Sequence, residues 1–246
     1  MKIFNKITAL ALASALLLIS LVSCTPKEES YKATVKTTFT SNDAAMAEAI
    51  AAFEKSDVTL YVSGNNMKLE SSTKIADIQL DRSYVAIDGI LYNTTALTAG
   101  DKAANEMQKA PFGTAEKAEI LLALGAGVPL DESDFNTVNE SNETKKVSYT
   151  CSDIKENAAA SLVSFFVNKL DSIDATVALV DAQYNVDTLD GKVQNYILNA
   201  SFEITVGGNT YSINMTIECE YDYRANVKIV APDGDYTEVT YKDIVG

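Results

Sequence analysis

The sequence predicts an α+β fold, in which a strongly curved antiparallel β-sheet, a half-barrel, is covered on its concave face by two or three helices. Three observations lead to this fold class. Long runs with apolar residues at every second position fill the last third of the chain. Two segments carry apolar residues at helical spacing. A strand, a helix and a meander occur twice, about 110 residues apart. The apolar face of such a sheet needs helices to cover it.

The first set of elements begins at Tyr31. Residues 31–39 alternate as a strand does, and Ser41 or Asn42 is placed to cap a following helix. That helix carries one apolar face made of Met46, Ala49, Ile50 and Phe53. Residues 58–72 predict two short strands around a Gly-Asn-Asn turn. Residues 83–93 predict a hairpin whose Asp88-Gly89 pair suits a tight primed turn.

The second set follows a segment of different composition. Residues 99–127 are rich in alanine, lysine and glutamate, and residues 115–124 predict a helix ended by two glycines. Residues 129–134 read as an acidic loop, and residues 143–151 as a strand. A helix over residues 155–170 presents Leu162, Phe165 and Phe166 on one face. The rest is nearly all strand, over residues 175–189, 192–206 and 210–232, with glycine-containing turns between the runs.

The N-terminal residues predict where the protein is located. Lys2 and Lys6 precede an uncharged apolar stretch over residues 7–22, which is typical of a signal peptide and short for a spanning helix. Leu21-Val22-Ser23-Cys24 looks like a bacterial lipobox, in which the cysteine sulfur receives a diacylglyceryl group. No other side chain there can form that thioether. The alternative is a signal peptide or membrane anchor that ends near a cysteine by chance.

We therefore expect a lipoprotein signal peptide over residues 1–23, a lipidated tether over 24–30 and a single domain over 31–246. The covalent diacylglyceryl on Cys24 is the only prosthetic group expected, and no cofactor is expected. Two acyl chains hold a protein stably on a membrane. The expected location is the bacterial cell envelope, outside the cytoplasm, with the protein anchored to a membrane by its lipid.

Composition narrows the function classes. The chain has 20 basic and 34 acidic residues, and removal of residues 1–23 takes away two lysines, so the mature net charge is 18 − 34 = −16. This charge repels phosphate backbones, and we expect no nucleic-acid partner. Histidine is absent, which excludes Ser-His-Asp and Cys-His catalysis and removes the commonest zinc ligand. No phosphate-binding loop or calcium-loop spacing occurs. We expect a monomer that is not an enzyme and holds no metal.

Two cysteines remain in the mature chain beside Cys24. Cys151 and Cys219 each lie in a strand-like run and share the parity of its apolar residues. Export to an oxidising compartment would permit a disulfide between them. The alternative is two separate buried thiols that act as small hydrophobic groups.

Three stretches carry a resemblance to a known family. Val62 to Glu70, Val85 to Asn93 and Val227 to Pro232, together with the lipobox at Cys24, resemble the LolA/LolB and LppX/LprG group of lipoproteins and lipid carriers. The resemblance implies a LolA-like half-barrel sheet closed by helices around an apolar cavity for acyl chains. The alanine-rich segment over residues 99–127 departs from the compact carriers.

These observations lead to one function and two alternatives. The function is a membrane-anchored, non-enzymatic lipoprotein that binds a lipid or another hydrophobic molecule between sheet and helices. The first alternative is a cell-surface module with a filled core that interacts with proteins or the cell wall, and the weaker second is a carboxylate-based hydrolase. The same apolar side chains would be ordinary core in a packed interior. The candidate cavity-lining residues are Met46, Ile50, Phe53, Leu162, Phe165 and Phe166.

Overall fold

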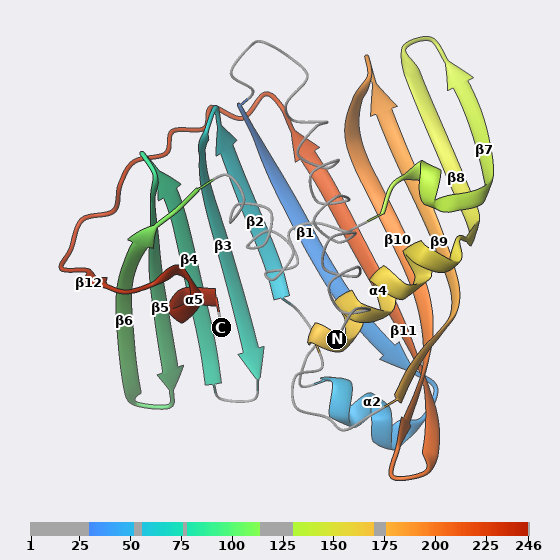
Figure 1. The fold of residues 1–246 in the computed structure, drawn as a ribbon, viewed down its shortest axis with the longest axis horizontal. Coiled ribbons are helices and arrows are strands. Elements are labelled where there is room, and N and C mark those ends of the chain that lie inside the picture. Colours follow the sequence, from blue (N-terminus) through green and yellow to red (C-terminus); the bar gives the residue numbers. More distant parts are fainter. Residues whose placement is uncertain (1–29, 52–55, 76–77, 114–129, 170–175, 246) are drawn as a thin grey trace, which may run out of the picture. The chain divides into compact units, whose positions relative to one another are not determined.

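The structure is a computed structural model that describes residues 30–51, 56–75, 78–113, 130–169 and 176–245 (Figure 1). The strands are β1 (Ser30–Ser41), β2 (Ser56–Ser63), β3 (Asn66–Ile75), β4 (Ile78–Ile87), β5 (Ile90–Ala99), β6 (Lys102–Pro111), β7 (Phe135–Glu143), β8 (Lys146–Ile154), β9 (Thr176–Leu189), β10 (Lys192–Val206), β11 (Asn209–Asp222) and β12 (Thr237–Glu238). The helices are α2 (Ala44–Ala51), α4 (Glu156–Lys169) and α5 (Tyr241–Val245), with a 3-10 turn η1 (Glu132–Asp134).

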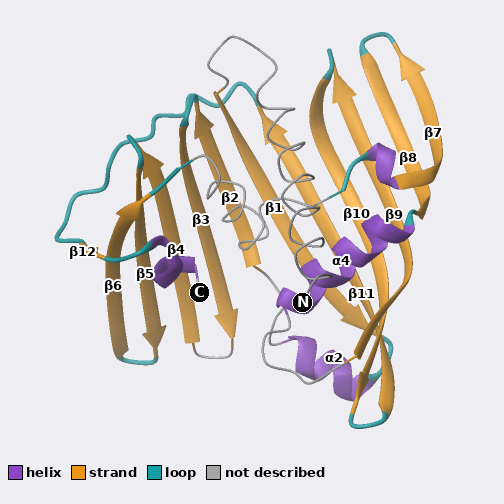
Figure 2. Ribbon diagram, viewed as in Figure 1, coloured by secondary structure: helices purple, strands orange, loops and turns teal. Residues whose placement is uncertain are grey.

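These strands form a 12-stranded sheet in the order β12-β6-β5-β4-β3-β2-β1-β11-β10-β9-β8-β7. The predicted α+β fold class, with two or three helices covering the sheet, is therefore wrong. Strand dominates the described residues (Figure 2), and the helices are short, with 14 residues in α4, eight in α2 and five in α5.

Part of the alanine-rich segment, for which no strand was predicted, adds to the sheet. Residues 102–111 form β6, which pairs antiparallel with β5 along its whole length. Helix propensities differ by less than about 0.7 kcal/mol per ordinary residue, and cross-strand pairing with a neighbour outweighs them. The helix predicted over residues 115–124 lies outside the described residues.

The contacts divide the chain into two compact units. Within the described residues, the first unit consists of 36–51, 130–169 and 176–220, and the second of 30–35, 56–75, 78–113 and 221–245. Both β1 and β11 are shared between the units.

In the first unit, alternate side chains of the strands build the core. The antiparallel register places Tyr196 of β10 opposite Val186 of β9 and Cys219 of β11, and all three are buried. Helix α4 packs on this face through Phe166. Helix α2 is capped by Asp43 and not by the predicted Ser41 or Asn42, because the Asp43 carboxylate accepts a hydrogen bond of 2.9 Å from the Met46 N–H.

In the second unit, β2 to β6 form an antiparallel meander, and β12 pairs parallel with β6. Its core includes Met67, Leu69 and Leu91, each fully buried. The predicted hairpin at Asp88-Gly89 is confirmed, with φ angles of 53° and 76°. The strand predicted over residues 210–232 ends at Asp222, so Val227 to Pro232 does not continue it.

Candidate functional site

The predicted ligand-lining residues form packed core where the structure describes them. Leu162 and Phe166 of α4 are fully buried, and Ile50 of α2 is 5% exposed, whereas Met46 is half-buried. Phe53, and the side chain of Phe165, lie outside the described residues. Of the predicted lining residues, Leu162 and Phe166 therefore lie together in the buried core of the first unit.

Phe166 fills the space between α4 and the sheet. Its ring stacks on Phe202 of β10 with centroids 4.0 Å apart and meets Phe39 of β1 edge-on at 5.9 Å. Both partner rings are buried as well. Two surface depressions among the described residues are lined by other side chains. The interior under α4 is thus filled with aromatic rings at this point.

The cysteines are buried thiols in the structure. Cys151 is fully buried on β8, and Cys219 is 1% exposed on β11. Strands β9 and β10 lie between β8 and β11. At about 4.8 Å per strand, three strand spacings exceed the roughly 7 Å that a disulfide can span between Cα atoms. Of the two alternatives, the structure has the separate thiols. Cys24 lies outside the described residues.

The opposite face of β8 to β11 carries a regular array of polar side chains. Strands alternate their side chains between two faces, so the residues between the buried ones share this outer face. The register aligns them in rows across the strands. We call the polar side chains of this face the polar face of the first unit, and they are Ser148, Thr150, Asp181, Gln183, Asn185, Asp187, Asn195, Asn199, Ser201, Asn214 and Thr216. Ile197 and Glu218 lie among them on the same face.

A shallow depression of about 300 Å³ lies in this face over β9, β10 and β11. Hydrogen bonds hold its side chains in place. The Ser201 hydroxyl donates to Asn214 Oδ1 at 2.8 Å, and the Thr216 hydroxyl donates to Asn199 Oδ1 at 2.9 Å. The amide groups of both asparagines keep Nδ2 donors that these bonds do not use. The depression therefore offers fixed donors and acceptors to a polar ligand.

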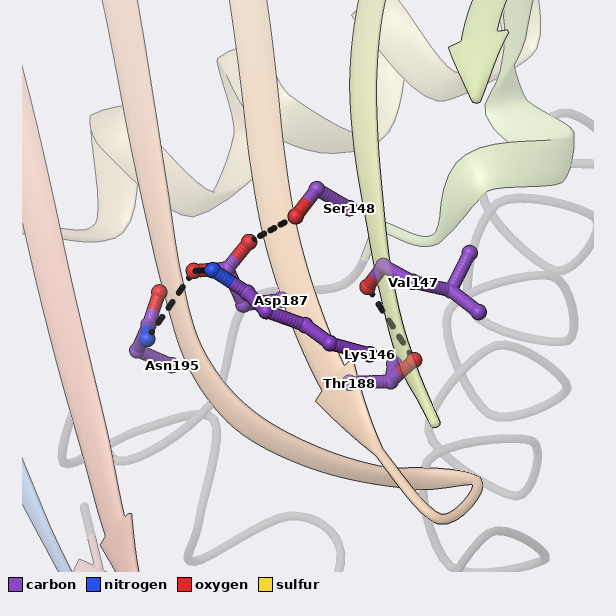
Figure 3. A network of polar contacts seen from close by, with 6 residues as sticks. All are labelled: Lys146, Val147, Ser148, Asp187, Thr188 and Asn195. Atoms are coloured by element: carbon purple, nitrogen blue, oxygen red, sulfur yellow. Dashed lines mark hydrogen bonds and ion pairs between the residues drawn. The ribbon is translucent and has the colours of Figure 1, made fainter. Parts of the chain in front are cut away.

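A second group on the polar face surrounds Asp187 (Figure 3). The Ser148 hydroxyl donates to Asp187 Oδ1 at 2.6 Å, Asn195 Nδ2 donates to Oδ2 at 3.4 Å, and Lys146 Nζ lies 3.4 Å from Oδ2. The bond from Ser148 is the main cause that lowers the pKa of Asp187, with the other two partners adding to it. Asp187 therefore stays ionised and fixed at neutral pH.

This arrangement favours binding over acid–base chemistry. A general acid near neutral pH needs a carboxyl with a raised pKa. Among the described residues, burial raises the pKa of the Asp134 carboxyl. That group belongs to η1, where Asp134 Oδ2 accepts from the Asp131 N–H at 2.9 Å and completes a capping box. Asp134 thus has a structural role.

The second unit has its own depression, of about 400 Å³, on the outer side of β2 to β5. Asp81 dominates its chemistry, because its carboxylate accepts from the Ser72 hydroxyl at 2.5 Å and from Gln79 Nε2 at 2.9 Å. Those partners satisfy the carboxylate within the sheet. We assign this depression a structural role.

Sequence reasoning missed the polar face because it followed only the apolar parity of each strand. The same alternation places Asn199 and Asn214 on the outside as surely as it buries Leu198 and Met215. The signal was therefore available, as a run of amides and hydroxyls on three consecutive strands. The cross-strand partnership of Asp187 with Ser148 needed the register.

No family model and no curated protein matches the chain. Among solved structures, the ywiB protein from Bacillus subtilis matches at 12% identity over 78% of this chain and 92% of its own, with a TM-score of 0.19. The dehydratase domain from the CurJ module of curacin polyketide synthase matches at 9% identity over 87% and 82%, with a TM-score of 0.13. Such TM-scores carry no argument about fold or activity. The resemblance to the LolA/LolB and LppX/LprG group stays a prediction.

Proposed function

We propose that this chain is a lipid-anchored, non-enzymatic interaction module of the bacterial cell envelope, which binds a polar cell-wall polymer through the polar face of its first unit. The anchor is the diacylglyceryl group expected on Cys24. The stacking of Phe166 on Phe202 at 4.0 Å carries the choice between the hypotheses, because it supports a filled core under α4. A filled core directs the search for a ligand to the outside of the sheet.

The polar face suits an extended polymer with many hydroxyl and amide groups. Neighbouring strands lie about 4.8 Å apart and residues on one face about 7 Å apart along a strand, so the face repeats its donors and acceptors in two directions. Asn199 and Asn214 are exposed. Their hydrogen-bonded partners Thr216 and Ser201 fix their side chains before binding, which lowers the entropic cost of association.

Co-sedimentation of the full-length protein with purified cell walls tests this proposal. We expect binding to fall at least tenfold in the double variant Asn199→Ala/Asn214→Ala, because each change removes an amide from the depression. Asn105→Ala on β6 is the matched control, since it removes an exposed asparagine of the second unit, outside the polar face. Equal sedimentation of the double variant and the control would rule out the polar face as the binding surface.

Native mass spectrometry of the same protein tests the lipid-carrier hypothesis. We expect the mass of the chain with its own covalent lipid and no further ligand. A second, non-covalent lipid that copurifies at a stoichiometric level would overturn the choice of a filled core.

A further inference from the structure

Three tyrosines cluster at one end of the second unit. Tyr31 lies at the start of β1, Tyr221 at the end of β11, and Tyr223 just beyond it. The ring centroid of Tyr31 lies 5.7 Å from that of Tyr221 and 5.6 Å from that of Tyr223. The rings of Tyr221 and Tyr223 stack with their centroids 6.0 Å apart. Tyr31 is buried, while Tyr221 and Tyr223 are half-buried and reach the surface.

The other face of the same strand end carries a fourth tyrosine between two cations. Tyr61 of β2 is half-buried, and the ammonium groups of Lys32 and Lys68 lie 5.9 Å and 5.8 Å from its ring centroid. Lys32 directly follows Tyr31 on β1, so the two groups of tyrosines lie on opposite faces of the same end. Arg224 is exposed next to Tyr223. We call these residues the aromatic–basic end of the second unit.

This end is also where the chain leaves toward its lipid. Strand β1 begins at Ser30, and Cys24 precedes it by six residues. Because an extended chain spans at most about 3.6 Å per residue, Ser30 lies within about 22 Å of Cys24, the residue expected to carry the lipid. An anchor in the membrane therefore keeps the start of β1 close to the headgroups.

We infer that the aromatic–basic end rests on the membrane that holds the anchor, with anionic phospholipid headgroups as its occupant. This inference rests on the lipid anchor of the proposed function. Tyrosine has an apolar ring and a polar hydroxyl, and it is enriched at membrane interfaces for that reason. Lys32 and Arg224 complement anionic headgroups, whereas Lys68 is ion-paired with Glu70 at 2.6 Å. The acidic remainder of the chain is repelled by the same surface, so both effects favour this orientation.

Tyrosine fluorescence measures this contact directly, because the chain has 12 tyrosines and no tryptophan. The full-length lipoprotein is reconstituted in vesicles of phosphatidylethanolamine and phosphatidylglycerol, either plain or brominated on the acyl carbons nearest the headgroups. Bromine quenches fluorophores in contact with it. Tyr61, Tyr221 and Tyr223 are three of the 12 tyrosines, so we expect about a quarter of the emission to be quenched.

Two variants separate the contact from the fold. Tyr221→Ser/Tyr223→Ser removes two of the rings, and we expect the quenched fraction to fall at least twofold. Lys32→Glu keeps every tyrosine and reverses one charge at this end, and we expect a similar fall. Lys102→Glu is the matched control, because it lies at the first residue of β6, at the opposite end of the meander, and we expect no change.

Flotation of the vesicles distinguishes the two possible failures. Protein that floats with the vesicles but shows equal emission in plain and brominated lipid overturns the inference and leaves the anchor intact. Quenching that Lys32→Glu and Lys102→Glu reduce equally also overturns it. Protein that does not float overturns the lipid anchor itself, and with it the basis of the inference.

Discussion

Replacement of Phe166 by alanine tests the filled core of the first unit most directly. The side chain is fully buried, stacks on Phe202 at 4.0 Å and meets Phe39 at 5.9 Å. Loss of a buried phenylalanine costs about 3–5 kcal/mol. Loss of two aromatic contacts, each of about 0.5–1.5 kcal/mol beyond burial, places this case in the upper half of that range, at about 4–5 kcal/mol.

The assay is urea and thermal unfolding followed by circular dichroism. For a protein of this size, each kcal/mol shifts Tm by about 2–4 °C, so we expect Phe166→Ala to lower Tm by roughly 8–20 °C. Val167→Ala is the matched control, because Val167 is the next residue of α4 and is 43% exposed. Its free energy of unfolding should change by less than about 0.5 kcal/mol. A loss below about 1 kcal/mol for Phe166→Ala would refute the reasoning and would indicate unfilled space under α4.

Three further outcomes follow from the described contacts. Ser148→Ala should raise the pKa of Asp187 toward its usual range in a carboxyl NMR titration, and an unchanged pKa would contradict the assigned cause. Because the pKa of Asp187 is lowered in the folded state, the ionised carboxylate stabilises the fold at neutral pH, and this stabilisation is lost as pH falls below about 4. Burial raises the pKa of the Cys151 thiol to about 11, and both Cys151 and Cys219 are buried. We therefore expect neither thiol to react with a thiol reagent at pH 8 until denaturant exposes both. If no thiol reacts after unfolding without reductant, the two cysteines form a disulfide. Gly191→Ala should lower the free energy of unfolding by about 1–2 kcal/mol, because Gly191 has a φ angle of +76°, which strains a residue with a side chain. A Cβ at this position would meet no atom within 4 Å, so backbone strain and not a steric clash is the expected cause. An unchanged free energy in urea unfolding would contradict that cause.

The sequence predicted local structure better than it predicted the fold class. Alternation located the long strands β9, β10 and β11, and the turn at Asp190-Gly191 is confirmed with φ angles of 52° and 76°. Helix α4 lies within its predicted range. One strand that the sequence did not predict covers residues 102–111, where alanine and lysine do not favour a strand and pairing with β5 decides the outcome.

The polar face could be predicted only in part. Parity alone places Asn199 and Asn214 outside, but their distance from each other depends on which strands are neighbours and in what register. The Asp187 group illustrates this limit, since Ser148 is 39 residues away in the chain. No pattern within one strand encodes a partner on another, and that part of the site required the structure.

The position of β1 beside β11 has a consequence for how the protein is made. The first strand of the described residues pairs with a strand that lies far later in the chain, and the Ser41 hydroxyl donates to the Ser212 carbonyl across 171 residues of sequence at 2.7 Å. Contacts between such distant residues form slowly, because a long loop must close before they do. The first unit therefore cannot be completed before the residues of β11 have been synthesised.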